Sequence, residues 1–245
     1  MALLSYYATP LIDLDARRLP FLAWYGVDHK KSPWYELFYI YQCVGVTINC
    51  LINVSMDTFP TLAMSAIVAQ IEVLSYKLKQ IGQEVVQEIK IQKCVIHHNF
   101  IQKLITDVEQ IFSIPLLVQF LLSGVIICVI GFQLSMLSPT KDKVSFVMNL
   151  VYFFTFTLQI FLPCYFGNEI SSKSALVSQS AFSSSWIETD SKIKKNMIIF
   201  MERSKRPLKI YAGKVFELSL GTFTMIINAS YKYYAVLHHM QKRRT

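Results

Sequence analysis

The chain has 245 residues, of which 53% are apolar and 16% are charged, and its mean hydropathy is +0.38. A soluble domain of this length carries about 25% charged residues, so the composition excludes a disordered, fibrous or nucleic-acid-coating protein and predicts an integral membrane protein. The formal net charge is +8, but Lys and Arg flank apolar segments instead of forming one stripe. The five cysteines contain no CxxC pattern, which argues against a zinc site or a disulfide framework.

Residues 1–33 are expected to hold the last turns of a membrane helix and an outer loop, because their apolar stretches are too short to cross a bilayer. Three longer runs follow that carry no formal charge: 20 residues between Glu36 and Asp57, 31 between Glu109 and Lys141, and 25 between Lys143 and Glu169. About 20 helical residues span the hydrocarbon core. Each run therefore predicts a membrane helix, and the chain is expected to be an all-α, multi-pass membrane protein.

A fourth apolar segment is interrupted by one lysine. Fourteen uncharged residues lie between Glu217 and Lys232, and apolar residues resume afterwards, which predicts one helix from about Val215 to His239. A charge inside a membrane is costly and usually faces protein or water, so this helix is not expected to sit wholly in lipid. The alternative is that Lys232 extends along its stem to a nearby interface.

The loops differ in their content of Lys and Arg. The loops 77–103 and 173–214 carry fourteen such residues, against nine in the loops on the other side. The positive-inside rule places these two loops in the cytoplasm and both chain ends outside, although the basic tail 242–244 disagrees.

Both cytoplasmic loops keep apolar residues at helical spacing, so long helices are expected to project into the cytoplasm and pack there as an anchor bundle. Around the first loop the pattern extends over residues 58–104 and the residue that follows, and its members are Leu62, Ile67, Ile71, Leu74, Leu78, Ile81, Ile101, Leu104 and Ile105. Those of the second are Leu176, Phe182, Trp186, Ile187 and Ile193.

Catalytic and metal-binding patterns are missing from the sequence. The pairs 97–98 and 238–239 are adjacent histidines, whose side chains diverge by about 100° on a helix and cannot hold one metal together. Neither HExxH nor GxSxG occurs, and no glycine loop could cradle a phosphate. We therefore expect no enzyme, no metal and no cofactor.

Two membrane surfaces combine an apolar face with a few hydrogen-bonding groups. The outer half of the first span offers Tyr39, Gln42, Cys43, Val46 and Thr47, and that of the third offers Met148, Tyr152, Phe153 and Thr155. Brought together, they would suit a small, volatile, mostly apolar ligand. Ordinary helix packing with aromatic residues at the membrane interface accounts for the same residues.

The last helix carries a stripe of aromatic and polar side chains on one face, where lipid would favour Leu and Ile. Its members are Ile227, Tyr231, Tyr234, Ala235 and His238. A helix that lines a narrow aqueous path in an oligomer would have such a face, and so would a helix packed against further helices.

Several runs along the chain form an ordered set. The carboxy-terminal run from Arg203 to Lys214, the segment Phe216–Leu220 and the run Ser230–Leu237 resemble the carboxy-terminal signature of insect odorant receptors. Further matches are the motif 164–169, Trp186 with Asp190, the segment 20–42, and the runs around His98, Ile111–Ser113 and Gln119-Phe120. The resemblance covers essentially the whole chain.

The resemblance implies subunits of ligand-gated cation channels with seven membrane helices, an intracellular amino terminus and an extracellular carboxy terminus. Such subunits combine with a shared co-receptor into tetramers in the plasma membrane of olfactory neurons and bind small volatile odorants. The family's pore constriction would fall near Tyr234 and Leu237, and the basic cluster Arg203–Lys209 would lie at the cytoplasmic mouth, with Glu202 and Glu217 as ion-pair partners.

The resemblance divides the chain into six parts: 1–33, the end of a membrane helix and an outer loop; 34–105, a membrane helix with a long cytoplasmic extension; 106–138 and 139–166, two membrane helices; 167–212, cytoplasmic anchor helices; and 213–245, the pore-lining helix and outer tail. Family members usually have a further amino-terminal part with two helices and most of a third, so the chain is expected to be amino-terminally truncated. The alternatives are a G-protein-coupled chemoreceptor, against which the absence of DRY-like and NPxxY-like motifs argues, and a non-signalling truncated receptor or scaffold.

Overall fold

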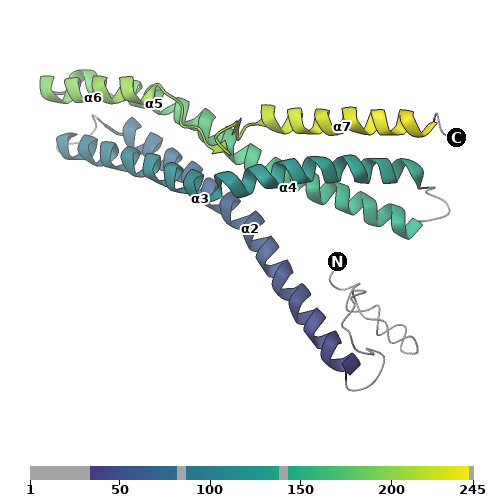
Figure 1. The fold of residues 1–245 in the computed structure, drawn as a ribbon. Helices are drawn as coiled ribbons and strands as arrows, with labels where there is room; N and C mark the ends of the chain where they lie inside the picture. The colour runs from purple at the N-terminus through teal and green to yellow at the C-terminus, as the bar shows by residue number, and fades with distance from the viewer. Residues whose placement is uncertain (1–33, 82–86, 138–142, 243–245) are drawn as a thin grey trace. The chain divides into compact units, whose positions relative to one another are not determined.

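The computed structural model describes residues 34–81, 87–137 and 143–242. The expected helix end and loop in 1–33, and residues 243–245 of the basic tail, lie outside this part of the chain. The described residues form long helices and one short hairpin (Figure 1). In chain order the elements are α2 (Trp34–Lys79), α3 (Gln87–Met136), α4 (Lys143–Ala175), α5 (Val177–Phe182), the 3-10 helix η1 (Trp186–Glu188), α6 (Ser191–Ser204), β1 (Tyr211–Ala212), β2 (Phe216–Glu217) and α7 (Leu220–Lys242).

Three stretches of helix are long and apolar enough to cross a membrane by length and composition. They are Trp34–Lys79, Glu88–Met136 and Lys143–Phe182, the last of which joins α4 and α5. These stretches contain the first and third uncharged runs and residues 110–136 of the second, and confirm these residues as helical. Among the helices of the described residues, α7 is not counted with these three, and its sequence carries Lys232 near the middle. How α7 meets the bilayer stays a prediction.

The chain divides into two compact units, Met1–Phe59 and Pro60–Thr245, and the boundary lies inside α2. Proline at position 60 has no backbone N–H to donate, and its ring crowds the carbonyl one turn earlier. A helix is locally weakened at such a residue. In the first unit, the described part of α2 begins with two stacked aromatic pairs, Trp34 on Phe38 and Tyr35 on Tyr39, with ring centroids 6.1 and 6.2 Å apart.

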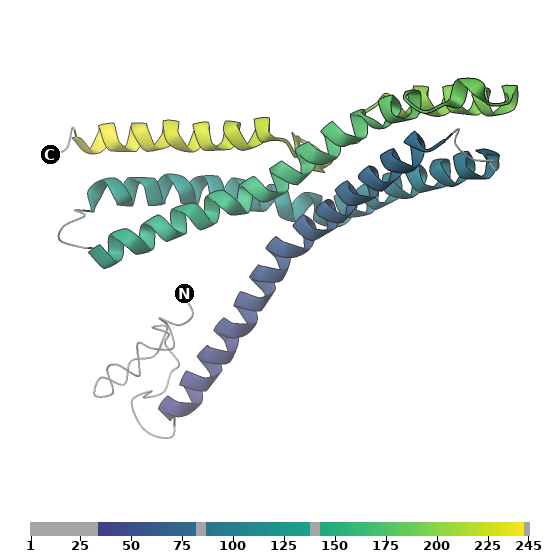
Figure 2. The same ribbon diagram turned by 180° about the vertical axis from the view of Figure 1, so that it is seen from behind.

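One end of the second unit is a helical bundle built from residues 60–79 of α2, the first half of α3, α5 and α6 (Figure 2). It buries most of the residues predicted from the first loop: Ile67, Ile71, Leu74, Leu78, Ile81, Ile101 and Ile105. Leu104 is half-buried, and Leu62, with 61% of its surface exposed, faces away from the core. The helical spacing therefore identified the packed stripe with one exception.

The second loop is also ordered as expected, but a different set of residues packs. Its core stripe is Ile193, Met197 and Phe200 on α6, at the spacing of successive helical turns. Trp186 is half-buried, whereas Leu176, Phe182 and Ile187 are exposed. Because α5 has only six residues, it can turn only a short face toward the core.

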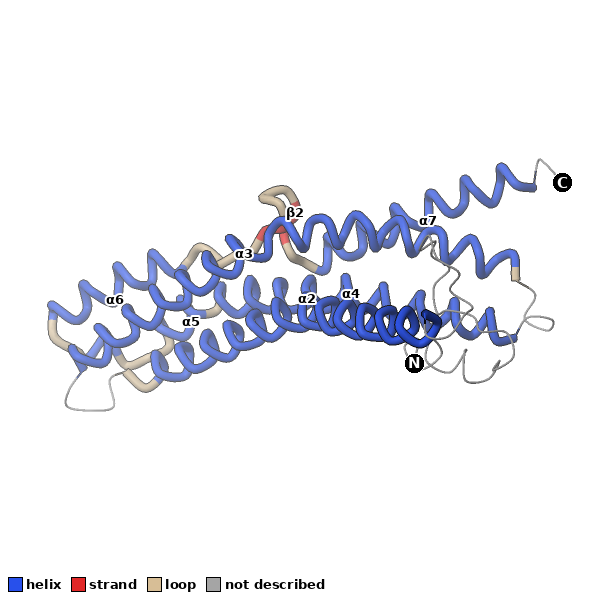
Figure 3. The backbone as a smooth tube through the Cα atoms, turned by 60° about the horizontal axis from the view of Figure 1, so that its bottom comes forward, coloured by secondary structure: helices blue, strands red, loops and turns tan. Residues whose placement is uncertain are grey.

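The helix predicted from Val215 begins later, at Leu220, because residues 211–217 form a hairpin (Figure 3). Gly213 and Lys214 adopt positive φ angles of 60° and 58°, which a right-handed helix cannot contain. The hydroxyl of Ser219 accepts a hydrogen bond from the backbone N–H of Thr222 at 3.2 Å. Ser219 therefore caps the helix that starts at the next residue.

Candidate functional site

α7 packs beside α3 and α4 in the second unit (Figures 1 and 2). Ser230 is buried at the contact, and its hydroxyl lies 2.9 Å from the carbonyl oxygen of Gly124 on α3 and 3.0 Å from that of Ile226. A Cβ atom at Gly124 would lie 3.4 Å from the Ile226 side chain, so the two helices are in van der Waals contact at this point. The face of α7 that holds Ser230 is therefore its packed face.

The aromatic stripe lies to one side of this packed face. The ring centroids of Tyr231 and Tyr234 are 6.1 Å apart, so the structure brings these two predicted pore residues together. Tyr231 is 67% exposed, while Ile227 and Tyr234 are half-buried. Leu237 and His238 belong to α7, and their side chains lie outside what the structure describes. The role of these five residues in a pore stays a prediction.

The ligand residues predicted on the first span lie on α2, within the first unit. Gln42 is buried, Tyr39, Cys43 and Val46 are half-buried, and Thr47 is exposed, its hydroxyl donating to the carbonyl oxygen of Cys43 at 2.7 Å. A surface pocket of about 410 Å³ lies along this part of α2, and Gln42 and Val46 are among the residues that line it.

The ligand residues predicted on the third span lie on α4, within the second unit. Met148, Tyr152 and Thr155 are all exposed, and the hydroxyl of Thr155 donates to the carbonyl oxygen of Val151 at 2.8 Å. Since the two sets of ligand residues belong to different units, a pocket formed by both stays a prediction.

The hairpin between α6 and α7 is fixed to α3 by two hydrogen bonds at one serine. The hydroxyl of Ser113 donates to the carbonyl oxygen of Tyr211 at 3.1 Å, and its own carbonyl oxygen accepts from the N–H of Gly213 at 2.9 Å. Sequence reasoning did not assign this serine a role, since a serine inside a long apolar helix gives no local signal of a distant partner.

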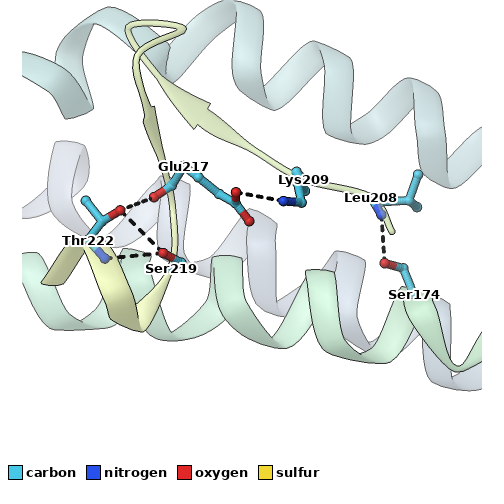
Figure 4. Close-up of polar contacts among 6 residues, drawn as sticks. All are labelled: Ser174, Leu208, Lys209, Glu217, Ser219 and Thr222. Atoms are coloured by element: carbon cyan, nitrogen blue, oxygen red, sulfur yellow. Dashed lines mark hydrogen bonds and ion pairs between the residues drawn. The ribbon is translucent and has the colours of Figure 1, made fainter. Parts of the chain in front are cut away.

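The segment that carries the hairpin is also fixed to α4. The backbone N–H of Leu208 donates to the hydroxyl of the buried Ser174 at 2.8 Å (Figure 4). At Gly167, a Cβ atom would lie 2.4 Å from the carbonyl oxygen of Leu218. Gly167 is part of the motif 164–169, so the structure gives this motif a physical reason: only glycine permits the approach.

Two ion pairs join the basic cluster to the glutamates predicted as its partners. The Lys205 ammonium lies 2.5 Å from a carboxylate oxygen of Glu202, and that of Lys209 lies 2.8 Å from Glu217 (Figure 4). The hydrogen bond to Glu217 raises the pKa of Lys209. The Lys209–Glu217 pair joins the segment before β1 to strand β2, a few residues before α7 begins.

The adjacent histidines of α3 point to different partners, as the sequence predicts. His97 forms a hydrogen bond of 2.8 Å with Gln70 of α2, and the buried His98 packs edge-on against Phe200 of α6, with centroids 5.4 Å apart. Burial lowers the pKa of both histidines, with smaller contributions from Lys77 at His97 and Arg203 at His98. Across residues 34–81, 87–137 and 143–242, no three His, Cys, Asp or Glu residues are grouped to hold a metal.

Comparison with solved structures shows the same fold. The olfactory receptor OR5 of Machilis hrabei, solved in complex with eugenol, matches with a TM-score of 0.78 at 20% identity, over 97% of this chain and 61% of that one. A second structure of the same receptor matches with a TM-score of 0.77. At this identity the likeness shows the fold alone.

Sequence comparisons lead to receptors from insects. Odorant receptor 2a of Drosophila melanogaster is 26% identical over 238 residues, which cover 90% of this chain and 59% of that receptor. Odorant receptor Or1 of Anopheles gambiae is 28% identical over 273 residues, covering 98% and 64%. The chain therefore spans about three fifths of the length of the curated relatives it matches. These relatives are named as receptors, in agreement with the expectation that the chain is not an enzyme.

The family described as "7tm Odorant receptor" matches residues 1–231. That range contains the runs on which the resemblance was based, apart from the end of the last one. Together with the long apolar helices and the shared fold, it makes the protein a multi-pass membrane protein. The chain belongs to the odorant receptor family.

Proposed function

We propose that the chain is a subunit of an odorant-gated cation channel in the plasma membrane of olfactory neurons. Its ligand is a small volatile odorant, and its partner is an odorant receptor co-receptor with which it forms a hetero-oligomer, a tetramer by the family pattern. The observation that carries the proposal is the family match over residues 1–231. Ligand binding opens the pore only if the open state binds the odorant more tightly than the closed state.

The arrangement of α7 supports its assignment as the pore helix. One face of α7 is hydrogen-bonded to α3 through Ser230. Tyr231, on another side of the helix, is 67% exposed. Copies of α7 from several subunits could surround an aqueous path with Ile227, Tyr231, Tyr234, Leu237 and His238. The proposed odorant site is formed by Tyr39, Gln42, Cys43, Val46, Thr47, Met148, Tyr152 and Thr155.

The first experiment measures current. The chain is co-expressed with a co-receptor in a heterologous cell, and a broad panel of volatiles is applied under voltage clamp. We expect odour-evoked cation current that is absent from cells with the chain or the co-receptor alone. Surface expression without current from any volatile would contradict the proposal for this chain.

The second experiment tests the pore with a matched pair of variants. Tyr231→Ala removes an exposed tyrosine from the stripe, and Tyr76→Ala removes one of similar exposure, 65%, from the part of α2 in the helical bundle. We expect Tyr231→Ala to shift the reversal potential between sodium and a large organic cation, because it changes the width of the path. Tyr76→Ala is expected to leave the reversal potential unchanged, and equal behaviour of both variants would remove Tyr231 from the pore.

The third experiment separates this function from a G-protein-coupled receptor. The proposal places the carboxy terminus outside the cell, where the loop charges of the sequence also put it. An epitope tag after Thr245 should bind antibody on intact cells. Staining only after permeabilisation would favour the G-protein-coupled alternative, and correct staining without any current would favour a non-signalling scaffold.

A further inference from the structure

α3 and α7 enclose an apolar groove of about 680 Å³. Its walls include Leu121, Val125 and Val129 on α3, and Met225, Ala229 and Tyr233 on α7. Ser230 also reaches the groove, but its hydroxyl is already bonded to backbone carbonyl oxygens. The groove therefore has few hydrogen-bonding groups for a polar ligand, and its apolar walls favour a hydrocarbon chain.

The groove lies in the membrane part of α3. Its residues on that helix fall within the 31-residue run without formal charge between Glu109 and Lys141, inside a stretch apolar enough to span a bilayer. In this position the surrounding solvent is lipid. An acyl chain is thus the occupant that the surroundings supply at highest concentration.

One end of the groove carries a positive charge at the boundary of the apolar run. Phe216 of the hairpin lines the groove, and the two residues before it are the exposed Lys214 and Val215, the latter 69% exposed. Lys214 forms no ion pair with any residue that the structure describes. A free lysine beside an exposed apolar side chain is the combination that meets lipid headgroups at an interface.

The hairpin is held at that level by α3. Gly213 is hydrogen-bonded to Ser113, four residues after the last charge at Glu109, and a Cβ atom at Gly213 would lie 2.3 Å from the Leu117 side chain. The groove residue Leu121 follows Leu117 by about one turn of helix, roughly 6 Å along the axis. Lys214 therefore belongs to a hairpin whose Phe216 lines the groove and whose Gly213 is held about one turn of α3 before the groove residue Leu121.

We propose that this groove binds one acyl chain of an anionic phospholipid from the leaflet on the hairpin side, with Lys214 against its headgroup. The charge of Lys214 selects an anionic over a zwitterionic headgroup, by about fivefold for one lysine. The proposal depends on the membrane placement of α3 and α7, and on no odorant or co-receptor, so it can fail or succeed independently of the proposed function.

The groove also lies behind Tyr231 of the proposed pore face. On a helix of about 3.6 residues per turn, Ala229 and Tyr233 point roughly opposite to Tyr231, while Tyr234 lies only about 100° from Tyr233. A lipid chain in the groove therefore packs against the back of α7 and supports the helix from the side away from the ions.

The test measures lipid retained by the purified chain in detergent. Native mass spectrometry compares binding of palmitoyl-oleoyl phosphatidylserine with that of the phosphatidylcholine of the same chains. We expect about fivefold more phosphatidylserine on the unaltered protein, loss of this preference in Lys214→Gln, and an unchanged preference in Lys103→Gln, which removes an exposed lysine elsewhere on α3. Equal binding of the two lipids, or equal effects of both lysine variants, would overturn the proposal.

Two further measurements locate the lipid. Ala229→Trp fills the groove and should lower binding of both lipids severalfold, while Val147→Trp on the exposed side of α4 should not. If Ala229→Trp fails to fold, a phosphatidylserine with a photoreactive group in its acyl chain is used on the unaltered protein, and label should gather on peptides containing Val125 and Tyr233. Label scattered over other surfaces, or label that reaches the groove only after the oligomer is dissociated, would mean that lipid does not occupy it.

Discussion

At the scale of single residues, Gly167 illustrates how a distant segment constrains one position. The carbonyl group of Leu218 passes so close to α4 that a Cβ atom at position 167 would lie 2.4 Å from its oxygen and 2.5 Å from the Leu218 Cβ. Both obstacles are fixed by the backbone before α7, so they cannot turn away as a flexible side chain would. Gly45 on α2 is the opposite case, with no atom within 4 Å of its Cβ position.

Gly167→Ala is therefore expected to destabilise the protein by about 1–3 kcal/mol, the usual cost of forcing extra atoms into a packed site. Gly45→Ala, which only improves helix propensity, should be neutral or stabilising by up to about 1 kcal/mol. Thermal unfolding in detergent measures both. A Gly167→Ala protein as stable as the unaltered one would show that the approach of Leu218 is not required.

His98 links stability to pH. Burial lowers its pKa in the folded protein, so the unfolded chain binds the proton more readily. Its contribution to stability is complete above the ordinary histidine pKa of about 6.5 and declines as the pH falls through the lowered value. The groups that set this behaviour are Phe200, against the ring, and the Arg203 guanidinium of α6.

The unfolding temperature should accordingly fall between pH 7.5 and 5.5, and His98→Gln should reduce that fall. His97→Gln should reduce it as well, since burial lowers the pKa of that group too. His239→Gln, at an exposed position of α7, serves as the control and should leave the pH dependence unchanged. An identical pH profile for His98→Gln and the unaltered protein would contradict this account.

At the scale of elements, the hairpin β1–β2 is the piece that connects the helical bundle to α7. It has only two residues in each strand and cannot be stable alone. Its position depends on Ser113 of α3, Ser174 of α4 and the Lys209–Glu217 ion pair. Hydrogen bonds thereby connect both helices to the segment that leads into α7.

Ser174→Ala removes the acceptor for the N–H of Leu208 and leaves that donor without its partner at a mostly buried site. The substitution is expected to destabilise the folded protein by about 1–3 kcal/mol. The segment before β1 should then open more often. Limited trypsin digestion should then cleave faster after Lys205 and Lys209. Ser135→Ala, which removes only a bond within an exposed helix end, should not accelerate it, and equal rates for all three proteins would refute the connection.

At the scale of the whole molecule, the second unit contains two differently built ends. The bundle of α2, α3, α5 and α6 has a core of buried apolar side chains, which include Met64 of α2 and Phe200 of α6. The helices at the other end, α4 and α7 beside the second half of α3, expose many apolar side chains instead, as expected for surfaces that meet lipid or further helices. Stability in detergent should therefore depend mostly on the bundle.

Leu74 and Leu62 give a matched comparison within α2. Leu74 is fully buried, so Leu74→Ala should cost about 2–5 kcal/mol through lost burial and the cavity left behind. Leu62 is 61% exposed, so the same substitution there should change stability by less than about 0.5 kcal/mol. Chemical denaturation followed by tryptophan fluorescence measures both, and similar costs would mean that the core does not dominate.

Much of the fold could be predicted because its signals are local. Uncharged runs of membrane length identified the apolar helices, and residues such as Ile71 and Leu78 revealed the packed stripe of the bundle by spacing alone. The ion-pair partners of Lys205 and Lys209 were also expected, from the resemblance. Leu62, Phe182 and Ile187 were included with the apolar stripes but lie exposed, because spacing does not tell where a packed stripe ends.

The composition and the periodicity of this chain were enough to specify a membrane protein of long helices, since hydrophobic length and helical spacing are properties of neighbouring residues. The hairpin, the late start of α7 and the roles of Ser113, Ser174 and Gly167 depend on contacts between residues far apart in the chain. Lys214, for example, adopts a left-handed conformation that its own residue type disfavours. It does so in a tight turn that the hydrogen bond from the Val215 N–H to the Ala212 carbonyl oxygen closes, while Ser113, about a hundred positions earlier, holds the neighbouring Gly213 against α3. No local pattern records that contact with Ser113.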